Sequence, residues 1–137
     1  MANSLEESHL PEAVAVPLRD LKESLASAAG SNLAALVLYG GLARGRYRPG
    51  KSDINVLVLL RDGSKDSLAA IAPALQAAWR KDLVEPMVFT AAELPQVAAE
   101  FPVKFLDIKG SHIVLAGEDL LTGLTVDPGV VRRRLRR

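Results

Sequence analysis

At 137 residues, the chain can bury one hydrophobic core but is too short for two domains of ordinary size. Its composition, 49% hydrophobic and 24% charged, is that of a globular protein and excludes wholesale disorder. The absence of cysteine excludes disulfides, thiolate metal sites and a cysteine nucleophile, and it fits a reducing compartment. The start MANSLEESHL is acidic and polar, unlike a secretory signal, and no apolar run approaches the ~18 residues of a membrane helix. We therefore expect a cytoplasmic protein with no membrane partner.

The net charge of +1 conceals an uneven distribution of charged residues. Five of the 17 basic residues are arginines in the last six positions, so the rest of the chain carries 12 basic and 16 acidic side chains. A mildly acidic body argues against a broad nucleic-acid-binding face, and nucleic acid is not an expected partner. The arginine-rich end fits either a solvated helix whose partners lie beyond this sequence or a nucleic-acid contact, and we favour the first.

The first half of the chain predicts a helix, two strands and a second helix. Residues 13–30 carry leucines at helical spacing and end in a glycine, which favours a helix stop. Residues 32–39 and 54–62 are apolar runs, so we expect strands buried on both faces at the centre of a sheet. Residues 64–81 are alanine-rich with an amphipathic helical pattern. Within them, Pro73 predicts either a kink or the true first turn of the helix.

The second half predicts two further strands with short helices between them. Residues 83–90 form the third expected strand, and Pro86 favours an edge position or the beginning of the strand. A short helix is expected within 91–100 and a short helix or turn over 101–108. The apolar segment 112–117 is the fourth expected strand.

The most informative motif is a pair of glycines after the first strand, followed by SDIN at the start of the second. Gly40 and Gly41 lack a Cβ, so the backbone there can approach a phosphate closely, and a helix start after such a turn would add free N–H groups. Asp53 would then hold a cation against the phosphates. The alternative is structural: a tight strand-to-helix turn at the glycines, with Ser52 and Asp53 binding turn N–H groups.

GGLARG followed by SDIN resembles the signature of the nucleotidyltransferase fold, shared by DNA polymerase beta, kanamycin nucleotidyltransferase and the minimal nucleotidyltransferases. That signature is Gly-Gly or Gly-Ser, a spacer, then Asp-apolar-Asp; here the spacer runs from Leu42 to Ser52. The later segment LAGED is similar to a strand end in the same family, so the resemblance covers roughly residues 33–124. It implies an α/β (α+β) fold, with a twisted mixed sheet of four to five strands and helices packed on it, which we expect on one side.

The resemblance also implies roles for individual residues. Gly40 and Gly41 would seat a nucleoside triphosphate, with Ser52 beside it, and Asp53 would bind Mg²⁺. Arg44 matches an arginine that many family members carry in this loop, so it would brace the loop or contact a phosphate; an ordinary surface arginine is the alternative.

The chain departs from the family pattern at two of the three acidic positions. Residue 55, which shares a strand face with Asp53, is Asn: its amide oxygen can coordinate magnesium but brings no negative charge. We therefore expect a site for one metal ion rather than for two. The third acid of the family aligns with Met87. A shifted register would instead offer Glu85, two residues earlier on the same face.

Three functions remain open at this stage. The favoured one is a nucleotidyltransferase-like domain that binds nucleoside triphosphate with magnesium, uses Asp53 and Asn55 in its catalytic position, and transfers weakly or not at all. Such a pseudoenzyme would act in sensing or regulation. The second is a non-catalytic interaction module of the same fold, working through a homo-oligomer or a helical partner domain. The third is an active transferase with altered metal ligands that include Glu85.

We expect one nucleotidyltransferase-like domain over residues 1–124, with its core at 33–124. Residues 125–137 are expected to begin a C-terminal helix, with Asp127 as its cap and Pro128 in its first turn. The shortness of that helix suggests that the natural chain continues into further helices. His9 and His112 are too isolated to form a metal site, and we expect Asp107, Glu118 and Asp119 to cap helices and turns.

Overall fold

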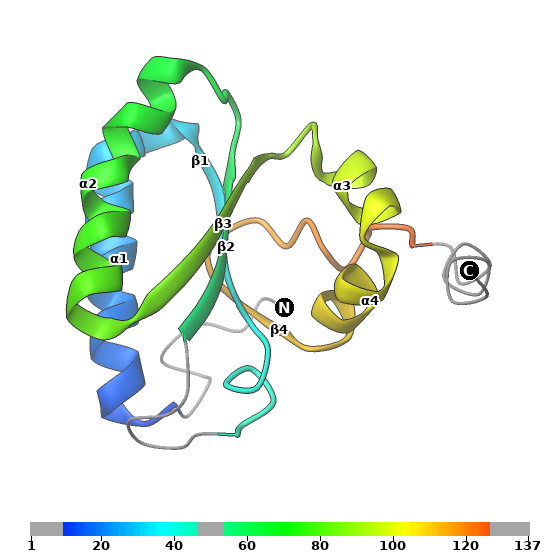
Figure 1. Cartoon of the computed structure of the whole chain (residues 1–137), viewed down its shortest axis with the longest axis horizontal. Coiled ribbons are helices and arrows are strands. Elements are labelled where there is room, and N and C mark those ends of the chain that lie inside the picture. The colour runs from blue at the N-terminus through cyan, green and yellow to red at the C-terminus, as the bar shows by residue number, and fades with distance from the viewer. Residues whose placement is uncertain (1–9, 47–53, 127–137) are drawn as a thin grey trace.

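The computed structural model describes residues 10–46 and 54–126. Asp127 and Pro128, with the helix that they are expected to begin, lie outside the described residues. Within the described part, the strands form one sheet and the helices pack on it (Figure 1). The elements are α1 (Glu12–Ala29), the 3-10 turn η1 (Gly30–Asn32), β1 (Leu33–Tyr39), β2 (Ile54–Leu60), α2 (Lys65–Asp82), β3 (Val84–Thr90), α3 (Leu94–Glu100), α4 (Pro102–Gly110) and β4 (His112–Gly117).

The sheet has four strands in the order β3-β2-β1-β4. β1 is antiparallel to both β2 and β4, whereas β2 and β3 are parallel. A parallel pair needs a crossover connection, and α2 supplies it between β2 and β3. The mixed sheet of four strands, with the α+β arrangement around it, confirms the expected fold class.

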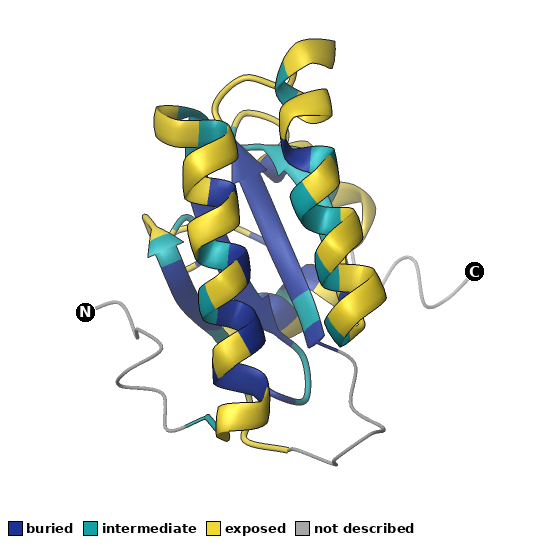
Figure 2. Cartoon of the chain, turned by 90° about the vertical axis from the view of Figure 1, so that its left-hand side faces the viewer, coloured by how far each residue is buried: buried dark blue, intermediate teal, exposed yellow. Residues whose placement is uncertain are grey.

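Helices cover both faces of the sheet, so the expectation that they lie on one side is wrong. α1 and α2 pack on one face of the sheet (Figure 2). Leucines of α1 and every second residue of β1 and β2 belong to the core on this face. α3, α4 and the segment 120–126 pack on the other face. The fully apolar β1 and β2 require this arrangement, because the side chains of a strand alternate between faces and both sets must be buried.

The strand positions follow the predictions from hydrophobicity. β1 and β2 are central and almost completely buried, as their apolar sequences indicate. β3 is an edge strand that carries Pro86, in agreement with the predicted edge position, because proline cannot donate to a neighbouring strand.

Pro73 does not mark the first turn of α2. The helix begins at Lys65, and Ser64 caps it by accepting a hydrogen bond of 3.2 Å from the Ser67 N–H. Residues 102–110 form the regular helix α4, which settles the choice between helix and turn in that segment.

Candidate functional site

Four polar side chains form a row across one end of the sheet. Tyr39, the last residue of β1, pairs with Asn55 of β2 on one side and with His112 of β4 on the other. Asn55 in turn pairs with Glu85 of β3. Directly paired residues point to the same face of a sheet, and Tyr39 belongs to the core beneath α3 and α4. The row therefore lies on that face, at the end of the sheet where the glycine turn begins.

Gly40 and Gly41 follow Tyr39 at this end of the sheet. Gly40 has a φ of +85°, a conformation that glycine adopts without strain. A Cβ at Gly40 would lie 3.3 Å from Nδ2 of Asn55, so the turn backbone is close to the side chain at position 55. The first glycine of the motif and the residue at position 55 are thus neighbours in space.

The glycines lead into a turn rather than a helix, which corrects the expectation of helix N–H groups at this point. The carbonyl oxygen of Gly41 accepts hydrogen bonds from the N–H groups of Arg44, at 3.1 Å, and Arg46, at 2.8 Å. Gly45, with a φ of +81°, completes the turn and donates to the carbonyl of Leu42. The turn is therefore closed by its own backbone.

Arg44 forms an ion pair with Asp107 of α4. This contact joins the glycine turn to the helix that covers the row. Asp107 lies within α4 and not at its start, so the expectation that it caps a helix is wrong.

The strand register places Glu85, and not Met87, beside Asn55. Met87 pairs with Leu57 and packs in the core, whereas Glu85 is exposed at the beginning of β3. Burial raises the pKa of the Tyr39 hydroxyl, and the nearby negative charge of Glu85 raises it further. Glu85 is therefore the carboxylate that the fold brings to the row.

Asp53 and Ser52, the first candidates for metal and nucleotide binding, lie outside the described residues. Within residues 10–46 and 54–126, no three His, Cys, Asp or Glu side chains cluster closely enough to hold a metal ion. Glu85 and the amide oxygen of Asn55 are donors of the hard, oxygen type that Mg²⁺ prefers. The described part of the site thus offers two adjacent oxygen donors, of which one is charged.

The family model of the nucleotidyltransferase domain matches residues 18–108 of this chain. The chain belongs to that family. Among curated proteins, no sequence matches it.

Solved structures show the same fold. Spectinomycin adenyltransferase AAD(9) from Enterococcus faecialis, solved with ATP and spectinomycin, has a TM-score of 0.64 and 16% identity to this nucleotidyltransferase domain. The similarity covers 86% of this chain and 62% of that enzyme, so the domain spans less than two thirds of its length. A toxin-antitoxin structure with AMP-PNP has a TM-score of 0.50 and 16% identity, with 87% of each chain covered. Identities this low establish the fold alone.

His112 and Asp119 form a contact in the nucleotidyltransferase domain that the sequence did not reveal. The His112 side chain is only 8% exposed, so it is not the ordinary edge residue that we expected. Its Nδ1 lies 2.9 Å from the carbonyl oxygen of Ile108, and its Nε2 lies 3.0 Å from Oδ1 of Asp119. Carbonyl oxygens only accept hydrogen bonds, so Nδ1 carries a hydrogen in this geometry. The imidazole thus joins the end of α4 to the chain after β4.

Asp119 caps the turn that follows β4, as predicted. It accepts hydrogen bonds from the N–H groups of Leu121 and Thr122 and from the Thr122 hydroxyl. Partial burial raises the pKa of Asp119, but the bonds from Thr122 and then from His112 outweigh this effect and lower the pKa to about 2.

The free energy of unfolding should therefore depend on the charge of Asp119 in acid. Its pKa in the folded state lies below the usual pKa of an aspartate, so the stabilisation is complete above pH 4 and is lost as the pH falls toward 2. Since the side chain is 30% exposed, we expect about 1 to 2 kcal/mol. Urea unfolding of Asp119→Asn should show lower stability at pH 7 and a shallower loss between pH 4 and 2. Glu118→Gln, which removes the neighbouring charge, is the control; an equal effect of both would contradict the assignment.

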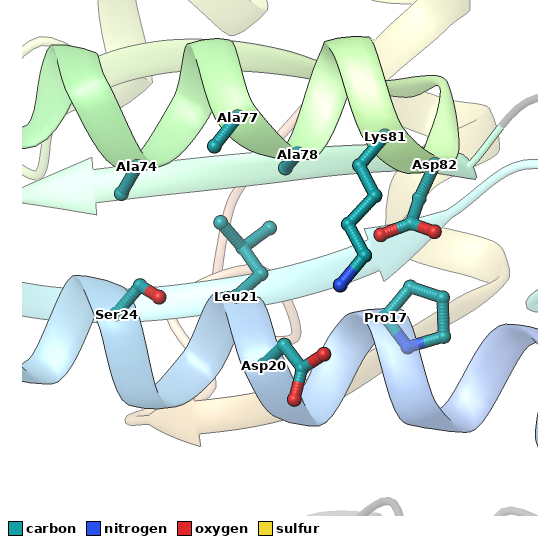
Figure 3. A pocket seen from close by; sticks show the side chains of 9 residues that line it. All are labelled: Pro17, Asp20, Leu21, Ser24, Ala74, Ala77, Ala78, Lys81 and Asp82. Carbon is teal, nitrogen blue, oxygen red and sulfur yellow. The ribbon is translucent and has the colours of Figure 1, made fainter.

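A groove between α1 and α2 lies on the opposite face of the sheet from the row of polar residues. Figure 3 shows Lys81 of α2 extending toward α1, where Asp20 lies, above a floor of small and apolar side chains. The groove is therefore separate from the glycine turn.

None of the described helices combines the length and the apolar character that crossing a bilayer requires.

Proposed function

We propose that this nucleotidyltransferase domain binds a nucleoside triphosphate with Mg²⁺ at the glycine turn and transfers nucleotidyl groups weakly or not at all. The observation that carries the proposal is the position of Asn55. Its side chain lies between Gly40 and Glu85, at the place where the family carries its second acidic residue. The turn that would seat the phosphates is therefore retained, while one negative charge that would hold the metal is absent.

Asp53, the Asn55 amide oxygen and Glu85 are the groups that would hold a magnesium ion. When bound, the ion would neutralise phosphate charge as the transfer proceeds. The backbone at Gly40 and Gly41 would accommodate the phosphates. With one carboxylate fewer, the site would stabilise the transition state less: a loss of ~4 kcal/mol is about a thousandfold in rate.

A second candidate is an active transferase with altered ligands, and the register of β3 favours it. Glu85 pairs directly with Asn55, so the site has a carboxylate on the neighbouring strand without any shift of register. In that case Glu85 would supply the charge that Asn55 lacks. The acceptor would be a hydroxyl-bearing molecule.

The test is magnesium-dependent binding of ATP, measured by calorimetry on the wild-type protein and on Asp53→Ala. We expect the wild type to bind and the Kd of the variant to rise at least tenfold, about 1.4 kcal/mol or more. Asp20→Ala is the matched control, because it removes a carboxylate from α1 on the opposite face of the sheet (Figure 3).

Two outcomes would contradict the proposal. If neither the wild type nor the variant binds any nucleoside triphosphate, the domain is an interaction module, and its partners become the question. If the wild type instead transfers labelled nucleotide at an ordinary enzymatic rate, the site is not impaired and the second candidate is correct; Glu85→Gln should then abolish the activity.

A further inference from the structure

We propose that Lys104 of α4 binds the phosphates of the nucleoside triphosphate at the glycine turn. The inference rests on the proposed nucleotide binding and adds to it a residue outside both sequence motifs. Lys104 is separated from the turn by about sixty positions in the sequence, and α4 brings it there.

Two side chains of α4 reach the end of β1 and the turn that follows. Asp107 pairs with Arg44 within the turn. Lys104 precedes Asp107 by three residues, so both lie on the same side of the helix. The Nζ of Lys104 lies 5.9 Å from the ring centroid of Tyr39, the residue immediately before Gly40. α4 therefore borders the site with one cation and one anion.

The ion pair between Arg44 and Asp107 makes Arg44 a weaker candidate for binding a phosphate. Its guanidinium charge is already balanced by Asp107, and Glu85 adds a negative charge near Tyr39. A triphosphate that binds at the glycine turn needs a positively charged group other than Arg44, whose charge Asp107 balances. Lys104 supplies one beside Tyr39, at the glycine turn.

The contact between Lys104 and Tyr39 leaves the ammonium group able to bind an anion. At 5.9 Å the lysine is near the outer limit of a cation–π interaction, which is weak at an exposed site. Lys104 is an exposed residue, and an ammonium group has three N–H donors. The ring thus positions the charge without consuming its hydrogen bonds.

The experiment compares nucleotide binding by the whole protein and by three variants, using calorimetry with Mg²⁺ and ATP, ADP, AMP or inorganic tripolyphosphate. Lys104→Gln removes the charge and keeps a good helix former, and Lys104→Arg keeps the charge. Lys81→Gln makes the same change of net charge on α2, on the opposite face of the sheet (Figure 3). Thermal unfolding of each variant establishes that it is folded.

We expect Lys104→Gln to raise the Kd for ATP and for tripolyphosphate about tenfold and the Kd for AMP less than threefold, because the lost contact is to the outer phosphates. Lys104→Arg should bind nearly as well as the wild type, and Lys81→Gln should bind identically to it. Equal ATP affinity in Lys104→Gln and wild type would overturn this inference alone. An equal loss for ATP and AMP would overturn it as well, since it would indicate a structural role. If the wild type binds neither ATP nor tripolyphosphate, the proposed function and this inference both fail.

Discussion

Replacing Asn55 with aspartate is expected to raise the rate of nucleotidyl transfer about a hundredfold to a thousandfold, which corresponds to ~3 to 4 kcal/mol of transition-state stabilisation. The new carboxylate would lie beside Gly40 and pair with Glu85, so it would add charge where a magnesium ion would bridge the phosphates. The measurement is transfer of labelled nucleotide by Asn55→Asp and by the wild type under identical conditions.

A second readout separates metal binding from catalysis. In Asn55→Asp, two carboxylates would face each other on neighbouring strands, and their repulsion should lower the free energy of unfolding in the absence of metal. Magnesium should reverse that loss and raise the Tm of the variant more than that of the wild type.

Adding Glu85→Gln tests whether the two positions act together. If they share a metal ion, the gain from Asn55→Asp should be largely lost in the double variant, and the two effects should be non-additive. No gain in rate and no effect of magnesium on the Tm would show that the site has lost more than one ligand, and it would favour the interaction module.

Gly117→Ala should lower the free energy of unfolding by about 3 to 5 kcal/mol, a large part of the 5 to 15 kcal/mol typical of a domain. Gly117 ends β4 with a φ of +78°, where a side chain is strained. A Cβ there would lie 2.0 Å from the carbonyl oxygen of Ala34 and 2.9 Å from the Cα of Ala35. These atoms belong to the backbone of the central strand β1, which cannot move without disturbing its pairing with β2.

Urea denaturation measures this effect, and Gly123→Ala provides the matched control. A Cβ at Gly123 would meet no atom within 4 Å, so its change should stay within about 0.5 kcal/mol. Equal stability of the two variants would contradict the close packing of β4 against β1. Gly117 belongs to the segment LAGED, which resembles a strand end of the family. The structure gives a physical reason for glycine at this position: it permits the close approach of the backbones of β4 and β1.

The hydrophobic pattern predicted the secondary structure well. Each of the four predicted strand segments became a strand, because each is a short, largely apolar run without helical spacing. The helices predicted at 13–30 and 64–81 carry their apolar residues at helical spacing. This spacing gives each helix one apolar side, which packs on one face of the sheet. Local sequence carries this information because periodicity and turn residues act over only a few positions.

The candidate site was only partly predictable. The glycine pair and the triplet around Asn55 are short motifs, so they could be read directly, and they led to the correct family. The sequence does not place Glu85 beside Asn55, because the register between β2 and β3 depends on hydrogen bonds across the sheet, which a single strand does not encode.

The sequence by itself determined the family, the four strands, the two long helices and the glycine turn, since these follow from local motifs and from the periodicity of apolar residues. Only the tertiary structure decided that helices cover both faces, that Glu85 stands beside Asn55, and that Arg44 pairs with Asp107. It also brought Lys104 to Tyr39 and buried His112 against Asp119. The physical reason is the same in each case: these contacts join residues from different elements, and their distances are fixed by strand register and helix packing rather than by neighbours in the chain.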